Sequence, residues 1–178
     1  QAINAPQGVS VAYTDSIPLL AVLCRPLAAA LGGTFQYFGW FTLVCFALQG
    51  GFAALLCGLF AEGLAAPLAG SLVFAASPIL LERAFRHTSL GAQWLVLAAL
   101  YCYFVCRRQS RFASRGLFVI NILAVGIHPY FLPMTYAVTL ALLLECAVKQ
   151  RQWLRPALFL GGNMLCTAAL GWELGLLY

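Results

Sequence analysis

Charged side chains are scarce in this sequence. Asp, Glu, Lys and Arg make up only 8% of its 178 residues, whereas an average soluble domain contains about 25%. Hydrophobic residues make up 63% of the chain. Such a composition cannot cover the surface of a water-soluble domain with polar groups, so it excludes that class and predicts a protein solvated by a lipid bilayer.

Several motifs of familiar chemistry are also missing. The sequence has no phosphate-binding glycine loop, no nucleophile elbow, no HExxH motif and no aspartate-rich metal run. Its seven cysteines stand singly in apolar segments, without a CxxC pair or a His at ligand spacing, and are most simply small core residues. The basic loops are short and flanked by apolar residues, so no nucleic-acid partner is expected.

Long apolar runs are what the sequence does contain. Four of them, residues 35–61, 64–81, 88–106 and 156–178, approach or exceed the ~20 residues that cross a bilayer as a helix. Residues 117–148 are too long for one crossing and are interrupted by His128 and two prolines. Because proline breaks helices, this stretch predicts two helices that meet near His128, the first of them short. The predicted fold class is therefore all-α, a polytopic transmembrane helix bundle.

The first 34 residues differ from the rest. Residues 17–31 are apolar but short for a crossing, and Arg25 with the following proline interrupts them. They predict an amphipathic helix at the outer membrane interface, with Asp15 or Ser16 as its N-cap and Pro18 in its first turn.

This difference divides the chain into two parts. Residues 1–34 form an outer loop with the interfacial helix, and residues 35–178 form the transmembrane helical bundle. Because the chain opens on Gln1 and stops at Tyr178 within an apolar run, we expect a fragment of a longer protein.

The basic residues predict the orientation of the bundle. Most of them lie in two short loops, residues 107–115 and 149–155, as in cytoplasmic loops of membrane proteins. Alternation of the helices then places residues 82–87, the break at His128 and everything before residue 35 on the outer side. Glu173 lies about 25 Å along its helix from the inner end, so it also reaches the outer leaflet.

Asp15 is the candidate base of this outer face. A carboxylate partly shielded from water can accept a proton from an incoming hydroxyl. The alternative is structural, with Asp15 serving as a helix N-cap or as the ion-pair partner of Arg25.

Arg83, Arg86 and His87 end one apolar run and are candidates for binding an anion. The planar guanidinium group matches the oxygens of a phosphate or pyrophosphate headgroup. Thr88 and Ser89 cap the next helix, whose first amides add a second feature that favours anions, and Gln93 lies just beneath. The alternative is anchoring to lipid headgroups together with a Glu82–Arg86 ion pair one helical turn apart.

The other candidates lie at the second break and in the last run. His128, followed by Pro129 and Tyr130, could bind metal, orient a sugar or shuttle a proton, or it could only satisfy backbone groups freed by the proline. Glu173 is an ionisable residue in an apolar run, which usually faces a cavity or a partner. Asn121 and Asn163 predict an interhelical amide contact worth about 0.6 kcal/mol.

Five short stretches carry a resemblance to a family of bacterial inner-membrane proteins related to the GT-C glycosyltransferases. They are Tyr13-Thr14-Asp15-Ser16-Ile17-Pro18-Leu19-Leu20, Phe35-Gln36-Tyr37-Phe38-Gly39, residues 45–50, Ser77-Pro78 followed by residues 83–94, and Ile127-His128-Pro129-Tyr130. The resemblance implies a multi-pass GT-C-like module in the bacterial inner membrane, which transfers sugar from a polyprenyl-phosphate donor to an acceptor on the periplasmic side. It implies that Asp15 is the catalytic residue. The candidate substrate-binding residues are Arg83, Arg86, His87, His128, Tyr130, Gln93, Glu173 and Arg25.

Two positions differ from the family pattern. Asp15 is alone where many GT-C enzymes have paired acids, and Gln93 stands where the family has a second His. A divalent metal would therefore need His87, His128 or Glu173 as a further ligand, and no clear metal motif is present. The alternative to an enzyme is a membrane carrier or a structural partner in envelope glycan or lipid assembly. Membrane lipid and the polyprenyl-phosphate-linked sugar are the expected partners, and the sequence leaves the oligomeric state open.

Overall fold

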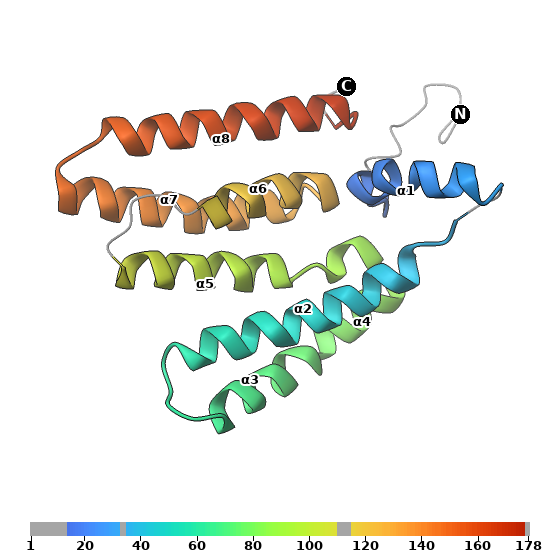
Figure 1. Cartoon of the computed structure of the whole chain (residues 1–178), viewed down its shortest axis with the longest axis horizontal. Coiled ribbons are helices and arrows are strands. Elements are labelled where there is room, and N and C mark those ends of the chain that lie inside the picture. The colour runs from blue at the N-terminus through green and yellow to red at the C-terminus, as the bar shows by residue number, and fades with distance from the viewer. Residues whose placement is uncertain (1–13, 33–34, 110–114, 177–178) are drawn as a thin grey trace.

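The structure is a computed structural model that describes residues 14–32, 35–109 and 115–176, and these residues contain helices and no strand. Tyr13, which belongs to one of the resembling stretches, lies outside the described residues, as do residues 110–114 of the first basic loop. The helices are α1 (Pro18–Ala30), α2 (Phe38–Gly58), α3 (Ala65–Ala75), α4 (Pro78–Arg86), the short 3₁₀ helix η2 (Thr88–Gly91), α5 (Trp94–Arg108), α6 (Arg115–Ile127), α7 (Phe131–Gln150) and α8 (Leu154–Glu173) (Figure 1).

Four helical segments among the described residues are long and apolar enough to cross a membrane, so the protein has the character of a membrane protein. They are Phe38–Gly58, Ala65–Arg86, Thr88–Arg108 and Pro129–Gln150. The first three correspond to predicted runs. The predicted span 156–178 corresponds to α8, which is a helix but is not among the four, so its crossing of the membrane stays a prediction. The fourth segment, Pro129–Gln150, contains α7.

Two of the apolar stretches are divided at prolines, because proline lacks the backbone N–H that would continue a helix. The prediction of two helices meeting near His128 is confirmed, since α6 ends at Ile127 and α7 begins at Phe131. The run 64–81 was predicted as one span, and the segment Ala65–Arg86 is long and apolar enough to cross, but it is built from two helices. It bends where α3 ends and α4 begins with Pro78 in its first turn, because proline has no N–H to continue the first helix.

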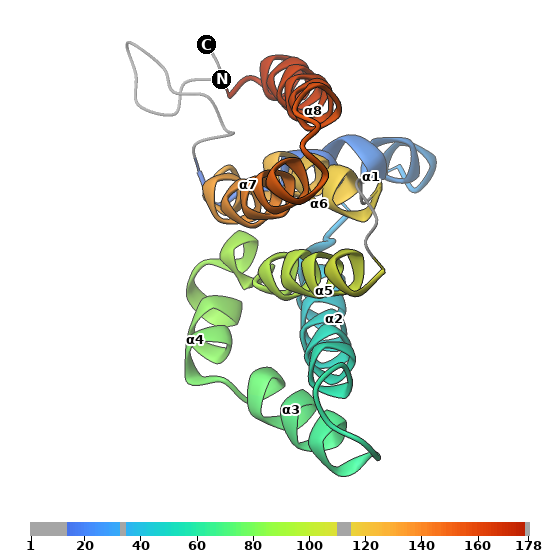
Figure 2. The same ribbon diagram turned by 90° about the vertical axis from the view of Figure 1, so that its left-hand side faces the viewer.

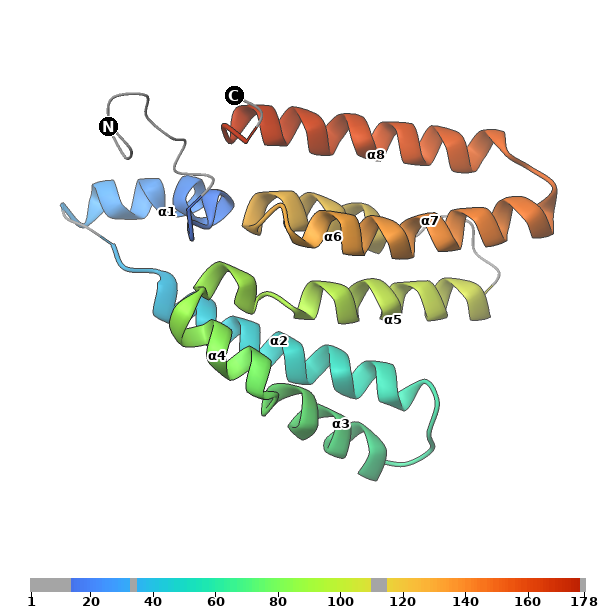
Figure 3. The same cartoon turned by 180° about the vertical axis from the view of Figure 1, so that it is seen from behind.

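The helices stack in layers in the order α3, α2, α5, α7 with α6, and α8, and each layer contacts the next. Figure 1 shows the layers from the side, and Figure 2 shows them nearly end-on, with α4 standing apart from α2. One end of the bundle holds η2, the α6–α7 break and the last turn of α8. The opposite end holds the end of α5 and the α7–α8 connection, both rich in basic residues (Figure 3). The basic connections and the segments around His87 and His128, which the sequence predicts at opposite ends, therefore lie at opposite ends of the bundle.

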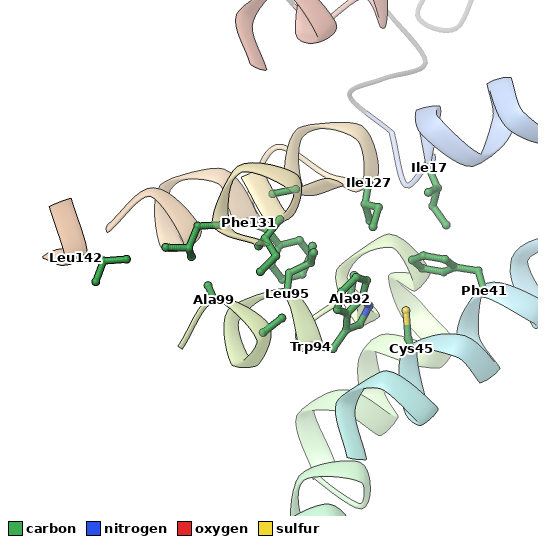
Figure 4. Packing of buried hydrophobic residues seen from close by; sticks show 14 of the residues in the cluster. Ile17, Phe41, Cys45, Ala92, Trp94, Leu95, Ala99, Ile127, Phe131 and Leu142 are labelled. Carbon is green, nitrogen blue, oxygen red and sulfur yellow. The ribbon is translucent and has the colours of Figure 1, made fainter. Parts of the chain in front are cut away.

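A core of buried apolar side chains joins the central layers (Figure 4). Phe41 and Cys45 from α2 meet Trp94 and Leu95 from α5, and the residues around the α6–α7 break close the cluster. Alanines at positions 92, 98 and 99 are fully buried there, as expected where membrane helices approach closely through small residues.

Polar contacts also link the helices. Asn121 Nδ2 donates to Asn163 Oδ1 at 2.9 Å and to Thr139 Oγ1 at 3.1 Å, which confirms the predicted amide contact and extends it to α7. Near the basic end, Glu145 of α7 pairs with Arg107 of α5 at 3.1 Å and accepts a hydrogen bond from Tyr103 at 2.8 Å. This second link was not predicted.

The N-terminal helix differs from its prediction at its first turn. Its N-cap position is Ile17 rather than the predicted Asp15 or Ser16, and the Asp15 side chain is bonded to Thr88 and Ser89. Ile17 is fully buried in the central core, and α1 packs against α6 with Leu19 close to Gly126. No side chain of α1 is fully buried. Its position at a membrane interface stays a prediction.

Candidate functional site

Asp15 joins the N-terminal segment to η2, although more than seventy residues separate them in sequence. Its Oδ2 accepts the backbone N–H of Thr88 at 2.8 Å, and its Oδ1 accepts the backbone N–H of Ser89 at 3.0 Å and also the Ser89 hydroxyl. The carboxylate therefore occupies the helix-start amides that were predicted to favour an anion. Asp15 is a helix cap, as the alternative proposed, but of η2 rather than of the following helix.

Two buried residues fix this carboxylate. Ile17 and Ser89 are both fully buried, one on each side of the contact. Arg25, proposed as an ion-pair partner of Asp15, is exposed on α1, and the structure shows no ion pair between them. Asp15 itself remains exposed, so the carboxylate can still meet a ligand.

His128 lies at the α6–α7 break, half-buried, and belongs to the same electrostatic neighbourhood. Its Nδ1 accepts the backbone N–H of Tyr130 at 3.2 Å, which requires an unprotonated nitrogen. Burial lowers the pKa of His128 from its ordinary 6.5, the Asp15 carboxylate raises it in part, and His87 lowers it further. The charges of Asp15 and His87 thus act on His128 from two other segments of the chain, and we call these three residues the Asp15 cluster.

A groove of about 590 Å³ is lined by residues of α2, α4, α5 and α7, among other elements. We call it the Arg83 groove. It is lined by Gln49, Phe74, Ser77, Ile79, Arg83, Leu90, Gln93, Val96, Leu97, Tyr130, Phe131 and Met134. Leu90 directly follows the serine that holds Asp15, and the ring of Tyr130 meets that of His128 edge to face at 6.5 Å between centroids. One part of the groove therefore borders the Asp15 cluster.

The structure separates the two arginines that the sequence treats as a pair. Arg83 is half-buried in the groove, and no carboxylate among the described residues lies within ion-pair distance of it. Arg86 is exposed, does not line the groove and lies 4.0 Å from Glu82, with which it forms the predicted ion pair. Such an exposed pair contributes little to stability, and its charge is partly neutralised. Arg83 is thus the better placed of the two to bind an anion.

Of the other candidate substrate-binding residues, some line the Arg83 groove and some do not. Gln93 and Tyr130 line the groove with Arg83. Arg25 and Glu173 do not line it. Glu173 does reach the end of the bundle that holds the α6–α7 break, as predicted, but α8 packs on α6 and α7, away from α4 (Figure 1).

Gln49 also lines the groove, and it was not among the predicted site residues. Its side chain is only 3% exposed, and its Oε1 has no hydrogen-bond partner although it is buried. A single amide in an otherwise apolar helix is the signal that could have identified it. Buried polar atoms without partners are rare in proteins, so Gln49 is a candidate for a ligand contact.

The described residues contain no group of three or more His, Cys, Asp or Glu side chains placed to hold a metal ion.

Comparison with known proteins places the chain in a family. No curated protein matches it, and no solved structure matches it. The resemblance to GT-C glycosyltransferases therefore stays a hypothesis. A family model does match over residues 1–178, and the chain accordingly belongs to the family described as "Domain of unknown function (DUF6311)".

Proposed function

We propose that this chain is the membrane-embedded part of a glycosyltransferase that passes sugar from a polyprenyl-phosphate donor to an acceptor on the periplasmic side of the bacterial inner membrane. The observation that carries the proposal is Arg83. Its half-buried guanidinium, without a carboxylate partner among the described residues, lines a mostly apolar groove that borders the Asp15 cluster.

The groove suits the amphiphilic donor. Phe74, Ile79 and Met134 provide apolar walls for an isoprenoid chain, and they come from helices with exposed apolar side chains. The guanidinium of Arg83 provides several N–H donors for phosphate oxygens. A charged group desolvated in this way is worth more to an anionic ligand than a fully exposed one.

Asp15 can perform the proton transfer that the reaction needs. The acceptor hydroxyl attacks the anomeric carbon, the bond from that carbon to the phosphate oxygen breaks, and the phosphate leaves with the electron pair. The hydroxyl proton passes to Asp15. A carboxylate has about four lone-pair sites. Three of the sites on Asp15 accept hydrogen bonds from η2, and Oδ2 accepts only one of these, so it keeps a lone pair for the proton.

A second function has one observation in its favour. The three hydrogen bonds from Thr88 and Ser89 already give Asp15 a structural role. A chain that binds the phosphorylated lipid without catalysis, as a carrier or a structural partner in envelope assembly, would need no further role for this carboxylate.

The proposal is tested by measuring sugar transfer by the full-length protein in lipid nanodiscs, supplied with polyprenyl-phosphate hexoses. We expect Asp15→Asn to lower turnover by about 10²- to 10⁴-fold, the usual contribution of a general base. Ser89→Ala is the matched control, because it removes one hydrogen bond to Asp15 and leaves the carboxylate in place. Lipid binding without turnover in the wild type would establish the binding function instead.

The arginines provide an independent test of the binding step. We expect Arg83→Ala to weaken binding of polyprenyl phosphate by about tenfold or more, since a charge-assisted contact is worth ~1.5–3 kcal/mol. Arg86→Ala should change it little, because Arg86 lies outside the groove and pairs with Glu82. Equal effects of the two substitutions would show that the groove is not the phosphate site.

A further inference from the structure

The lining of the Arg83 groove includes, besides the cation, a buried glutamine whose side-chain oxygen is unsatisfied. Gln49 lies on α2, is 3% exposed and lines the groove, and its Oε1 has no hydrogen-bond partner. The core near it is well packed, with Phe52 of α2 stacked on Trp94 of α5 at 5.9 Å between ring centroids. Gln49 is therefore held one turn from a fixed aromatic contact, beside the first turn of α5.

We infer that Gln49 is a specificity-determining residue, whose side-chain carbonyl accepts a hydrogen bond from a hydroxyl of the sugar on the polyprenyl-phosphate donor. The inference rests on the proposed function and names the part of the donor that this wall of the groove recognises. Nothing else in the described structure uses this acceptor.

Of the parts of the lipid-linked donor, the sugar is the one that can donate a hydrogen bond to Gln49 Oε1. A polyprenyl-phosphate sugar has three parts, and the hydrocarbon chain has no hydrogen-bond donor. The phosphate is an anion that offers only acceptors, so a carbonyl oxygen repels it and Arg83 attracts it. Only the sugar has O–H groups that can donate to Oε1.

The polar side chains near Gln49 are consistent with a sugar site. Ser77, at the bend between α3 and α4, and Gln93, at the N-terminus of α5, line the same groove. Both can donate and accept hydrogen bonds, as the hydroxyls of a sugar require. Gln93 also directly precedes the buried Trp94 that anchors this region.

An unpaired buried carbonyl makes this contact selective. A ligand hydroxyl that reaches Oε1 satisfies it, whereas a ligand without that hydroxyl leaves it desolvated and unpaired. Sites built around such buried polar groups reject analogues that lack the matching hydroxyl.

The test compares the binding of two probes to the full-length protein in nanodiscs, undecaprenyl phosphate and undecaprenyl-phosphate hexose, by native mass spectrometry. Gln49→Met keeps the length of the side chain and removes the carbonyl. We expect it to weaken binding of the hexose-loaded lipid by about tenfold, a typical loss for one hydrogen bond at a buried site, and to leave the bare lipid unchanged.

A series of deoxyhexoses locates the hydroxyl. One deoxy analogue should bind the wild type as weakly as the parent hexose binds Gln49→Met, and should be insensitive to the substitution. Folding does not obscure the result, because the substitution removes no hydrogen bond that the structure shows and the melting temperature reports any loss of packing.

Two outcomes would overturn the inference. If Gln49→Met leaves both affinities unchanged, or lowers both equally, Gln49 does not contact the sugar. That result stands apart from failure of the proposed function, in which the wild type would bind neither lipid and Arg83→Ala would have no binding to weaken.

Discussion

The Oδ1 atom of Asp15 accepts the backbone N–H of Ser89 at 3.0 Å, across 74 positions of sequence. The contact holds the segment before α1 on the start of η2, next to the α6–α7 break. It places Asp15, the one acidic residue among residues 1–30, at the border of the Arg83 groove. The same carboxylate is therefore a structural link and the candidate base.

The structural part of this role predicts a difference between two substitutions. Ser89→Ala removes one hydroxyl donor and should lower the free energy of unfolding by about 1 kcal/mol. Asp15→Ala leaves the amide of the buried Ser89 without its acceptor and also removes the exposed bond to Thr88, so it should cost more, about 2–3 kcal/mol. Unfolding by SDS titration in mixed micelles measures both. Equal losses would mean that the amides find other partners.

His128 predicts a pH dependence of stability. Its pKa in the folded protein lies below the ordinary 6.5, mainly because of burial, so the unfolded chain binds a proton first as the pH falls. Stability should be fully present above about pH 6.5 and should decline as the pH falls through the lowered folded pKa.

The matched comparison uses His128→Asn in a His87→Asn background, so that His128 is the one imidazole of the cluster that the two variants differ in. Asn retains an acceptor for the Tyr130 N–H but has no proton to gain. Melting temperatures between pH 7.5 and 5.5 should decline less in this variant than in His87→Asn alone. Parallel curves would show that His128 does not control the slope.

The amide contact between α6 and α8 predicts a measurable coupling energy. Asn121 and Asn163 are both fully buried and lie 2.9 Å apart between Nδ2 and Oδ1. A double-mutant cycle with Ala at both positions should give a coupling of about 0.6 kcal/mol, with ~1.7 kcal/mol as the upper range for membrane helices. Thr42→Val is the control, because its hydroxyl bonds only within α2 and should show no coupling to Asn163.

Gly126 predicts a steric limit on the docking of α1. A Cβ at this position would lie 2.9 Å from the Cβ of Leu19, closer than van der Waals contact allows. Gly126→Ala should therefore displace α1 and lower the free energy of unfolding by about 1–3 kcal/mol. Gly51→Ala, also within a helix but with no atom within 4 Å of the added Cβ, should be neutral or slightly stabilising. SDS titration compares the two, and equal behaviour would rule out the close approach.

Local signals predicted the helices with good accuracy. The break at His128 was predicted because proline removes a backbone donor wherever it stands. The bend at Pro78 could have been predicted on the same ground, but the apolar run continues through it and hides it. The helix α8 was predicted as well, but it is not among the four segments that are long and apolar enough to cross, so its span stays a prediction.

Partners of polar side chains were predicted less well. The Glu82–Arg86 and Asn121–Asn163 contacts were predicted, the first because one turn of helix separates the two residues and the second because amides in neighbouring spans lie at equal depth. The cap that Asp15 forms on η2 and the unpaired carbonyl of Gln49 were not predicted. Both depend on which helices come into contact, and no spacing along the chain encodes that.

The sequence by itself determined that the protein has the composition of a membrane protein, that it is helical, and that its polar residues group at the two ends of the bundle. The length of the apolar runs, the positions of the prolines and the placement of the charges carry this information, because a chain in lipid must satisfy its own backbone and keep its charges near the ends of its helices. Only the tertiary structure decided that Arg83 enters a groove while Arg86 turns outward, and that Asp15 meets Ser89. The reason is geometric, because the position of a side chain in a helix bundle depends on how whole helices pack, and small residues such as Gly126 set that packing from far along the chain.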